Sequence, residues 1–219
     1  MNYFSHYSER ELHILRIWVK QSDFLPPGCK FQRDNTPYHD AKAILPDGTE
    51  FLVQVKEEEE YWFAKTGNIG LDYISAFRFK TRDDEHRYLR ELNFWVPPEE
   101  IATFLERIEV DRWGKLMTCD AHVHIFYVGR KSELGASESP LLLKTYCNNW
   151  LRSKRFIKYL TSKHRLRIND KKSYDIDEPW HSAAFFLKPS DPMLKVAEID
   201  TFEKLLRCIH SRDLSRSSP

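Results

Sequence analysis

Three polar side chains, Asp40, Gln54 and Lys56, have types and a spacing that suit the hydrolysis of a phosphodiester. A carboxylate beside a lysine at the end of a strand can hold a divalent cation and position a water molecule. Magnesium prefers few protein ligands and several waters, so one Asp and a carbonyl oxygen already make a credible site. An acid, an amide and a lysine on an exposed hairpin are nevertheless most often only solvated. The surrounding sequence must therefore decide between a solvated face and a metal-binding site.

A predicted β-hairpin over 40–45 and 50–56 brings these side chains to one face. The connecting Pro46-Asp47-Gly48 has the chemistry of a type I turn closed by a glycine bulge. The two strand ends pair in such a three-residue loop, and counting back places Asp40 directly across from Gln54. The lysine two residues further along shares that face. The alternating residues point into a core: Phe51, Val53 and Val55.

Several motifs around the hairpin together resemble the PD-(D/E)XK nuclease superfamily. Asp40 is followed after thirteen residues by Gln54-Val55-Lys56, the variant with glutamine at the middle position. Ala64-Lys65-Thr66-Gly67-Asn68-Ile69-Gly70-Leu71-Asp72-Tyr73 looks like a Thr-Gly-Asn signature before a strand that carries an acid. Trp113-Gly114-Lys115-Leu116-Met117-Thr118-Cys119-Asp120-Ala121 is similar to the small-residue turn and acid-bearing strand that follow. Glu11 stands where resolvase-like members carry an extra glutamate.

The resemblance covers roughly residues 8–128 and implies both a fold and an activity. The implied fold is an α/β (α+β) restriction-endonuclease-like domain, with a central mixed β-sheet flanked by helices. The implied activity is that of a metal-dependent endonuclease that hydrolyses DNA phosphodiester bonds with Mg²⁺ or Mn²⁺. DNA is the expected partner, no membrane partner is expected, and a homodimer is left open.

The resemblance also implies a role for each matched residue. Asp40 would bind the metal directly, and Gln54 would complete or orient that site. Lys56 would position the attacking water and stabilise the charge that develops on the phosphoryl oxygens. Glu11 would be a further metal ligand or, equally well, only a helix-cap residue. Two acids are accessory candidates, the first of which could instead be a strand residue paired with a base: Asp72 and Asp120.

Gln54 is the main departure from the family pattern, because an amide oxygen supplies no charge to a cation. Metal affinity should therefore be low unless Asp72, Glu58 or Asp120 compensates. The alternative is a catalytically inactive nucleic-acid-binding or assembly protein on the same fold. A weaker rival is a zinc site, because Asp120, His122 and His124 would alternate along one predicted strand and share a face.

The carboxy-terminal third carries a basic segment. Residues 144–172 contain ten Lys or Arg and one acid, whereas residues 83–111 contain nine acids and three bases. A predicted helix over 148–162 turns apolar residues inward and leaves bases outside, and further bases follow it. Lysines and arginines of this kind supply sequence-independent affinity for phosphates. The candidate nucleic-acid-binding residues are Lys154, Arg155, Lys158, Lys163, Arg165 and Arg167.

The order of predicted elements is that of one mixed α/β domain over 1–210, with an insertion at about 76–112 and a flexible tail over 211–219. Helices are expected over about 9–21, 97–109, 148–162 and 201–210, and strands over 40–45, 50–56, 69–79, 116–128 and 183–189.

Composition restricts the class of protein. Apolar residues make up 41% and aromatic residues 14% of 219 residues, which excludes a wholly disordered chain. The amino terminus lacks the pattern of a signal peptide, so a cytoplasmic protein is expected. Four cysteines without a close pair argue against structural zinc and a disulfide framework, and reduced thiols are expected.

Overall fold

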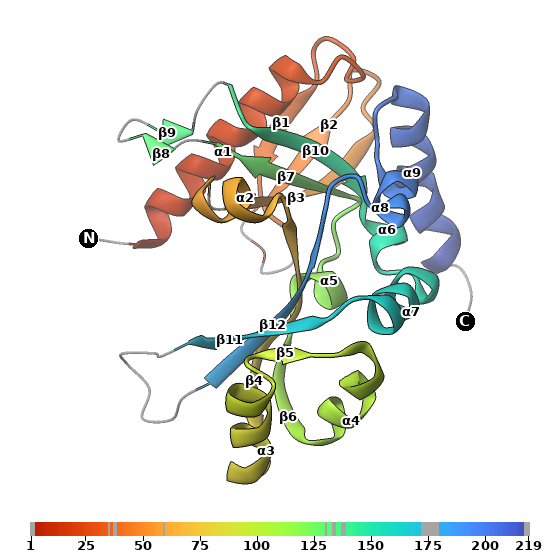
Figure 1. Ribbon diagram of the computed structural model, residues 1–219. Helices are drawn as coiled ribbons and strands as arrows, with labels where there is room; N and C mark the ends of the chain where they lie inside the picture. Colours follow the sequence, from red (N-terminus) through yellow and green to blue (C-terminus); the bar gives the residue numbers. More distant parts are fainter. Residues whose placement is uncertain are drawn as a thin grey trace. The chain divides into compact units, whose positions relative to one another are not determined.

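Two β-sheets, one mixed and one antiparallel, organise the chain and are flanked by helices (Figure 1). The computed structural model describes residues 3–34, 36, 39–58, 60–129, 131–132, 135–136, 139–171 and 180–216. Each sheet belongs to its own compact unit. Unit 1 comprises Met1–Gly67, Cys119–Leu151 and Pro189–Pro219, and unit 2 comprises Asn68–Thr118 and Arg152–Lys188.

The sheet of unit 1 has the strand order β1-β2-β3-β7-β10. Only β3 and β7 are parallel, and every other neighbouring pair in this sheet is antiparallel. All residues of β7 are buried, as expected for a strand with partners on both sides. The strands are β1 (Lys30–Arg33), β2 (Ala41–Ile44), β3 (Glu50–Glu58), β7 (Val123–Val128) and β10 (Leu142–Cys147), and a separate ribbon pairs β8 (Lys131–Ser132) with β9 (Gly135–Ala136).

The hairpin of β2 and β3 has the register that its turn predicts. Ala41 lies opposite Val53, which continues the pairing that starts at the turn. The Leu45 amide donates to the Thr49 carbonyl at 2.9 Å. Gly48 has a φ of +87°, the left-handed conformation that the bulge requires and that glycine adopts without strain. The local turn chemistry was therefore sufficient to fix which residues share a face.

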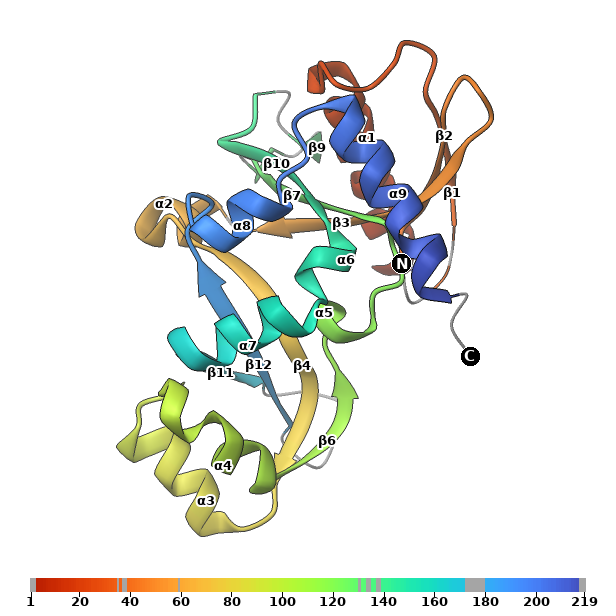
Figure 2. The same cartoon turned by 90° about the vertical axis from the view of Figure 1, so that its right-hand side faces the viewer.

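Helix α1 (Tyr3–Gln21) and helix α9 (Phe202–Arg216) contribute to the core of unit 1 (Figure 2). Trp18 is fully buried, and its indole N–H donates to the Thr145 hydroxyl at 2.8 Å. As predicted, the apolar face of β3 enters this core, which also contains these residues: Ile14, Leu15, Phe51, Val53, Val55, Leu205 and Ile209. The shorter helices of unit 1 are α2 (Glu60–Thr66), α6 (Asn148–Leu151) and α8 (Pro192–Ala197).

Both terminal helices differ from the prediction in their bounds. Backbone hydrogen bonding begins α1 at Tyr3, so the expected cap at Ser8 lies inside the helix. Helix α9 continues to Arg216, past the expected start of a tail, and residues 217–219 lie outside the described part of the chain. No helix within the described residues is long and apolar enough to cross a membrane.

The sheet of unit 2 is antiparallel throughout, with the order β5-β11-β12-β4-β6. The expectation of one central sheet is therefore wrong, because β4 pairs with β12 and β6 and not with the hairpin. Strands β6 and β11 were not predicted, because charged residues interrupt their apolar pattern. The strands are β4 (Ile69–Phe79), β5 (Trp95–Val96), β6 (Ile108–Trp113), β11 (Leu166–Lys171) and β12 (Trp180–Leu187).

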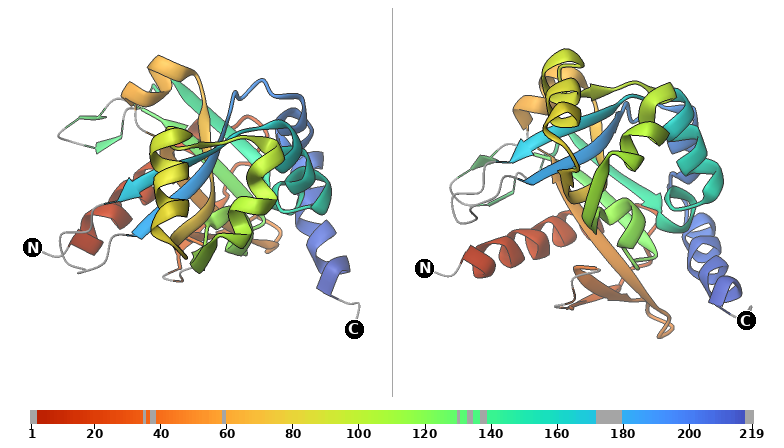
Figure 3. Two further views of the ribbon diagram at one scale, coloured as in Figure 1. Left: turned by 60° about the horizontal axis from the view of Figure 1, so that its bottom comes forward. Right: turned by 90° about the horizontal axis from the view of Figure 1, so that it is seen from below.

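Aromatic side chains fill the core of unit 2. Phe77 contacts Phe104 edge to face at 5.4 Å, and Phe79 stacks on Tyr88 at 6.0 Å. These contacts hold helices against one face of the sheet, and Figure 3 shows α3 and α4 on that side. The residues expected as an insertion, 76–112, form part of this unit. Its helices are α3 (Arg82–His86), the π-helical turn η1 (Arg87–Glu91), the 3₁₀ turn η2 (Pro98–Glu100), α4 (Ile101–Glu106), α5 (Lys115–Thr118) and α7 (Lys154–Lys163).

Two predicted elements are divided in the structure. The strand expected over 116–128 is helix α5 followed by the shorter strand β7. The helix expected over 148–162 is α6 and α7, separated at Ser153. The Ser153 hydroxyl accepts from the Phe156 amide at 3.1 Å, so it caps a new helix and ends the old pattern.

The expectation of four reduced thiols is wrong. Cys147 on β10 and Cys208 on α9 form a disulfide, with their Cα atoms 5.7 Å apart. The sequence gives no close pair because the two cysteines are 61 residues apart, and only the folding of unit 1 brings them together. Cys29 and Cys119 are free thiols.

Candidate active site

The carboxylate of Asp40 and the amide of Gln54 meet at the open end of the hairpin, as their predicted pairing requires. Asp40 stands directly before β2, and its backbone amide donates to the Val53 carbonyl at 3.0 Å. Its carboxylate Oδ2 accepts from the Val55 amide at 2.7 Å and from the Gln54 side-chain Nε2. Two donors from β3 thus fix the orientation of this acid.

Gln54 is almost fully buried, at 5% exposure, and both ends of its amide have partners. Nε2 donates to Asp40 and also to the Val55 carbonyl at 3.0 Å. Oε1 accepts from the Cys119 thiol at 3.9 Å. An amide ligates a cation only through its oxygen, so Gln54 must turn its amide over to act as a ligand beside Asp40.

Lys56 and Glu58 follow Gln54 at alternate positions of β3 and therefore point to the same face. The Lys56 Nζ lies 3.8 Å from the Glu58 Oε1, and both side chains are mostly buried. This distance is long for a charge-assisted hydrogen bond. The face thus carries an acid, an amide and an ammonium group in a row.

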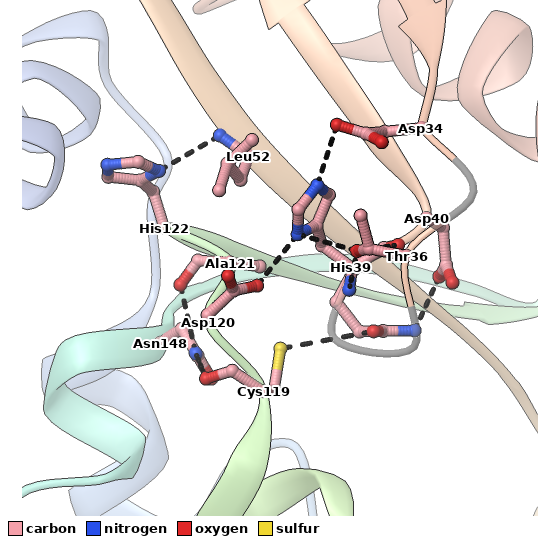
Figure 4. A network of polar contacts seen from close by, with 11 residues as sticks. Asp34, Thr36, His39, Asp40, Leu52, Cys119, Asp120, Ala121, His122 and Asn148 are labelled. Atoms are coloured by element: carbon pink, nitrogen blue, oxygen red, sulfur yellow. Dashed lines mark hydrogen bonds and ion pairs between the residues drawn. The ribbon is translucent and has the colours of Figure 1, made fainter.

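The structure adds a buried histidine that sequence reasoning missed. His39 directly precedes Asp40 and is 5% exposed (Figure 4). Its Nδ1 lies 2.7 Å from the Asp120 carboxylate, and its Nε2 lies 3.0 Å from the Asp34 carboxylate. The Thr36 hydroxyl lies 3.1 Å from the same Nδ1. The adjacent His39-Asp40 pair was the available signal, but Asp120 is 81 residues away and could not be assigned from spacing.

The two carboxylates control the charge of His39. Burial by itself lowers the pKa of the imidazole, but the hydrogen bonds and charges of Asp34 and Asp120 more than offset it, so the pKa is raised. The protonated ring can donate from both nitrogens and satisfy both acids at once. His39, the residue directly before Asp40, is therefore bound to the accessory candidate Asp120.

The rival zinc arrangement is not formed. Asp120 and His122 precede β7, so the three residues do not alternate along one strand as expected. The His122 Nδ1 accepts from the Leu52 amide at 2.9 Å, and buried His124 stacks on Phe126 with ring centroids 4.7 Å apart. Across the residues that the structure describes, no group of three or more His, Cys, Asp or Glu is placed to hold a metal ion.

Glu11 is half-buried on α1, which packs against the face of the sheet opposite to that of Gln54 and Lys56. Its neighbour Arg10 forms a bidentate ion pair with Glu57, which points toward α1. The expected role as a helix cap is wrong, because α1 begins before Glu11. Its predicted role as a metal ligand would require it to act from the other side of the sheet.

Asp72 belongs to unit 2, where it is half-buried on β4 opposite Ala184. Its carbonyl oxygen lies against Gly114, where an added Cβ would come within 2.2 Å. Only glycine permits this approach between β4 and the start of α5, which explains the small residue after Trp113. The structure does not group Asp72 with the hairpin residues in one unit.

The predicted basic residues lie in unit 2. Lys154, Arg155 and Lys158 are exposed on α7, while Leu160 is buried, as the helical pattern predicts. The first turn of α7 contains no acid, although cations are unfavourable at that end of a helix macrodipole. Among the described residues, these members of the group form no ion pair: Lys154, Lys158, Lys163, Arg165 and Arg167.

Comparison of the chain with protein-family models, with curated proteins and with solved structures finds no match.

Proposed function

We propose that the protein is a metal-dependent endonuclease that hydrolyses DNA phosphodiester bonds by a PD-(D/E)XK-type mechanism. The observation that carries the proposal is the meeting of Asp40 and Gln54 at the hairpin, with Lys56 next on the same face. In this proposal the mixed sheet of unit 1, with α1 on its apolar face, is the restriction-endonuclease-like core.

The oxygens at the hairpin suit Mg²⁺ or Mn²⁺. The Asp40 Oδ2 and the Val55 carbonyl both accept from the Gln54 Nε2, so two hard oxygen donors converge on a position that the Gln54 nitrogen must leave before a cation can take it. A turned amide would add the Gln54 oxygen as a third donor. Magnesium accepts such a set and keeps its remaining positions for water. These three oxygens would hold the metal.

The side chains would divide the reaction between them. A bound divalent cation supplies Lewis-acid polarisation of the phosphate and a more acidic water. Asp40, oriented by the Val55 amide, provides the only full negative charge of the ligand set. Lys56 stabilises the negative charge that grows on the phosphoryl oxygens, because its ammonium group is on the same face as Asp40 and is mostly shielded from bulk water. Gln54 orients the site.

The partner in this proposal is DNA, held by the bases of unit 2 through its phosphates. A cytoplasmic location stays a prediction. The Cys147–Cys208 disulfide argues against it, since such bonds are rare in a reducing compartment.

One observation favours the alternative, a catalytically inactive nucleic-acid-binding or assembly protein. The Gln54 amide nitrogen, and not its oxygen, faces Asp40. The carboxylate that would bind a metal therefore accepts hydrogen bonds from the hairpin itself. Such a protein would bind DNA without any need for a metal.

The test is cleavage of linear, nicked, branched and single-stranded DNA with Mg²⁺, Mn²⁺ or EDTA. We expect metal-dependent cleavage that Asp40→Ala lowers by about 10²-fold or more, while DNA binding largely survives. Glu50→Ala is the matched control, because it removes one acid from the same hairpin face at the far end of β3.

Gln54→Glu separates the two functions. In a working nuclease this variant keeps activity and binds the metal more tightly, because it adds one anionic hard ligand. If the wild-type protein cuts no DNA with either metal, and Asp40→Ala alters neither binding nor metal response, the nuclease proposal is wrong and the inactive protein is favoured.

A further inference from the structure

One face of the unit 2 sheet carries aromatic rings and guanidinium groups together. Leu166 and Ile168 of β11 are fully buried on the core side. Because side chains alternate along a strand, Arg167 points to the opposite face, with Arg165 directly before the strand. On neighbouring strands Trp95 and Phe186 share that face. We refer to these four residues as the arginine–tryptophan platform: Trp95, Arg165, Arg167 and Phe186.

Direct contacts hold the platform together. The guanidinium carbon of Arg167 lies 5.0 Å from the Trp95 ring centroid, and that of Arg165 lies 5.6 Å from it. The Phe186 ring meets Trp95 edge to face at 6.5 Å. Arg167 and Trp95 are opposed in the pairing of β11 with β5, so the backbone register itself sets their contact.

The platform is open to a ligand. Arg165 is exposed, and the other members are half-buried. Neither guanidinium has an ion-pair partner within the described ranges of the chain. Asp72 lies in the same row of the sheet, but two strands away from Arg167, or about 10 Å. Two cations side by side without an acid repel each other, and an anion between them would relieve that repulsion.

The combination indicates what kind of anion fits. An arginine held on an aromatic ring presents a flat, pre-positioned guanidinium that can stack on a nucleobase and bind phosphate. Bases inside a duplex already stack on one another, so side chains on a sheet can reach only an unpaired base. A phosphate alone would need no tryptophan, and an acidic peptide would gain no stacking.

We propose that the arginine–tryptophan platform binds a single-stranded segment of DNA, with an unpaired base stacked on Trp95 or its arginines and the adjoining phosphates on the guanidinium groups. The inference rests on the proposed function for the choice of DNA and deepens it, because it names a substrate with an unpaired strand. The bases of α7 would extend the phosphate track, since Lys163 is followed after one residue by Arg165.

The experiment measures binding and not cleavage, so its result is independent of the nuclease proposal. Fluorescence anisotropy would be recorded in EDTA, on the Asp40→Ala protein, with a labelled thymidine oligonucleotide of about 16 nucleotides and with a duplex of equal length. We expect tighter binding of the single strand. Trp95→Leu should weaken it about tenfold, since one stacked base contributes about 1–3 kcal/mol, and should leave duplex binding unchanged.

Trp113→Leu is the matched control, because Trp113 lies on β6 at the other edge of the same sheet, where it contacts Tyr73 at 5.6 Å. The double variant Arg165→Lys/Arg167→Lys keeps both charges but removes the flat guanidinium. It should lower single-strand affinity while leaving the salt dependence of binding nearly unchanged. This variant also tests the proposal if Trp95→Leu does not fold.

Three results would overturn the inference: equal loss of single-strand and duplex affinity in Trp95→Leu, no loss in either, or wild-type affinity in the double lysine variant. Cleavage without any preference for single strands in binding would support the nuclease proposal and contradict the platform proposal. Single-strand binding without any cleavage would support the platform proposal and contradict the nuclease proposal.

Discussion

The buried charges of unit 1 and the bases of α7 and β11 in unit 2 have opposite surroundings. In unit 1, His39 lies between two acids, and Glu198, at 7% exposure, lies between Lys144 and Lys195. In unit 2, no ion pair within the described ranges involves Lys154, Lys158, Lys163, Arg165 or Arg167. The two arginines contact the Trp95 ring.

The difference shows where each unit can gain from a ligand. A buried charge costs free energy unless it is paired, and the buried charges of unit 1 have partners within the unit. An exposed base costs little and stays available, so unit 2 gains most when a polyanion arrives. Lys56 is intermediate, because its side chain is mostly buried and the Glu58 carboxylate lies 3.8 Å from its Nζ.

The largest effect is expected at Lys56. If this lysine stabilises charge in the transition state, Lys56→Ala lowers single-turnover cleavage by about 10²-fold or more. Lys42→Ala is the control, because Lys42 lies on the same hairpin face and is paired with Glu50 at 3.0 Å. Equal losses in the two variants would show that only the general charge of the face matters.

An intermediate effect is expected when the bases of α7 are removed. The triple change of Lys154, Arg155 and Lys158 to Ala should weaken DNA binding by about tenfold and flatten its salt dependence. It should change the melting temperature little, since all three side chains are exposed. The matched control removes three bases that are paired in unit 1: Lys42, Lys204 and Arg207. If the control weakens binding as much, net charge and not position governs affinity.

The smallest effect is expected at Glu198 and concerns stability. Burial raises the pKa of this carboxyl, but Lys144 and Lys195 more than offset it, so the pKa is lowered. A lowered pKa stabilises the fold above the ordinary value of 4.5, and this contribution is lost as the pH falls through the lowered value.

Glu198→Gln should therefore cost about 1 kcal/mol at neutral pH, measured by urea unfolding. The cost should shrink as the pH falls below 4.5. A cost that is the same at every pH would show that shape, and not charge, makes Glu198 stabilising.

The hairpin was predictable because its information is local. Three turn residues determine which side chains face one another, and the meeting of Asp40 with Gln54 follows from their register. The outward face of α7 was predictable for the same reason, since helical spacing separates Lys154 and Lys158 from Leu160.

What could not be predicted depends on distant partners. Nothing in the sequence near His39 indicates its contact with Asp120, which is 81 residues away. The two cysteines of the disulfide, Cys147 and Cys208, are likewise 61 residues apart. The second sheet was not predicted, because Arg165 and Arg167 interrupt the apolar pattern of β11. These two side chains belong to the outer face of that strand. Ser153 could have been identified as a helix N-cap from its residue type. The apolar pattern that continues on both sides of it instead predicted one uninterrupted helix.

The interleaving of the two units has a consequence for the chain as it leaves the ribosome. The chain passes between the units after Gly67, Thr118, Leu151 and Lys188. Helix α1 is synthesised well before α9, yet residues of both helices belong to the same core. At about 5–20 residues per second, the apolar side of the nascent α1 waits on the order of ten seconds for that partner. During synthesis the apolar face of α1 is therefore exposed and could be bound by a chaperone. Neither unit can be produced as one uninterrupted fragment, because each is built from several segments of the chain.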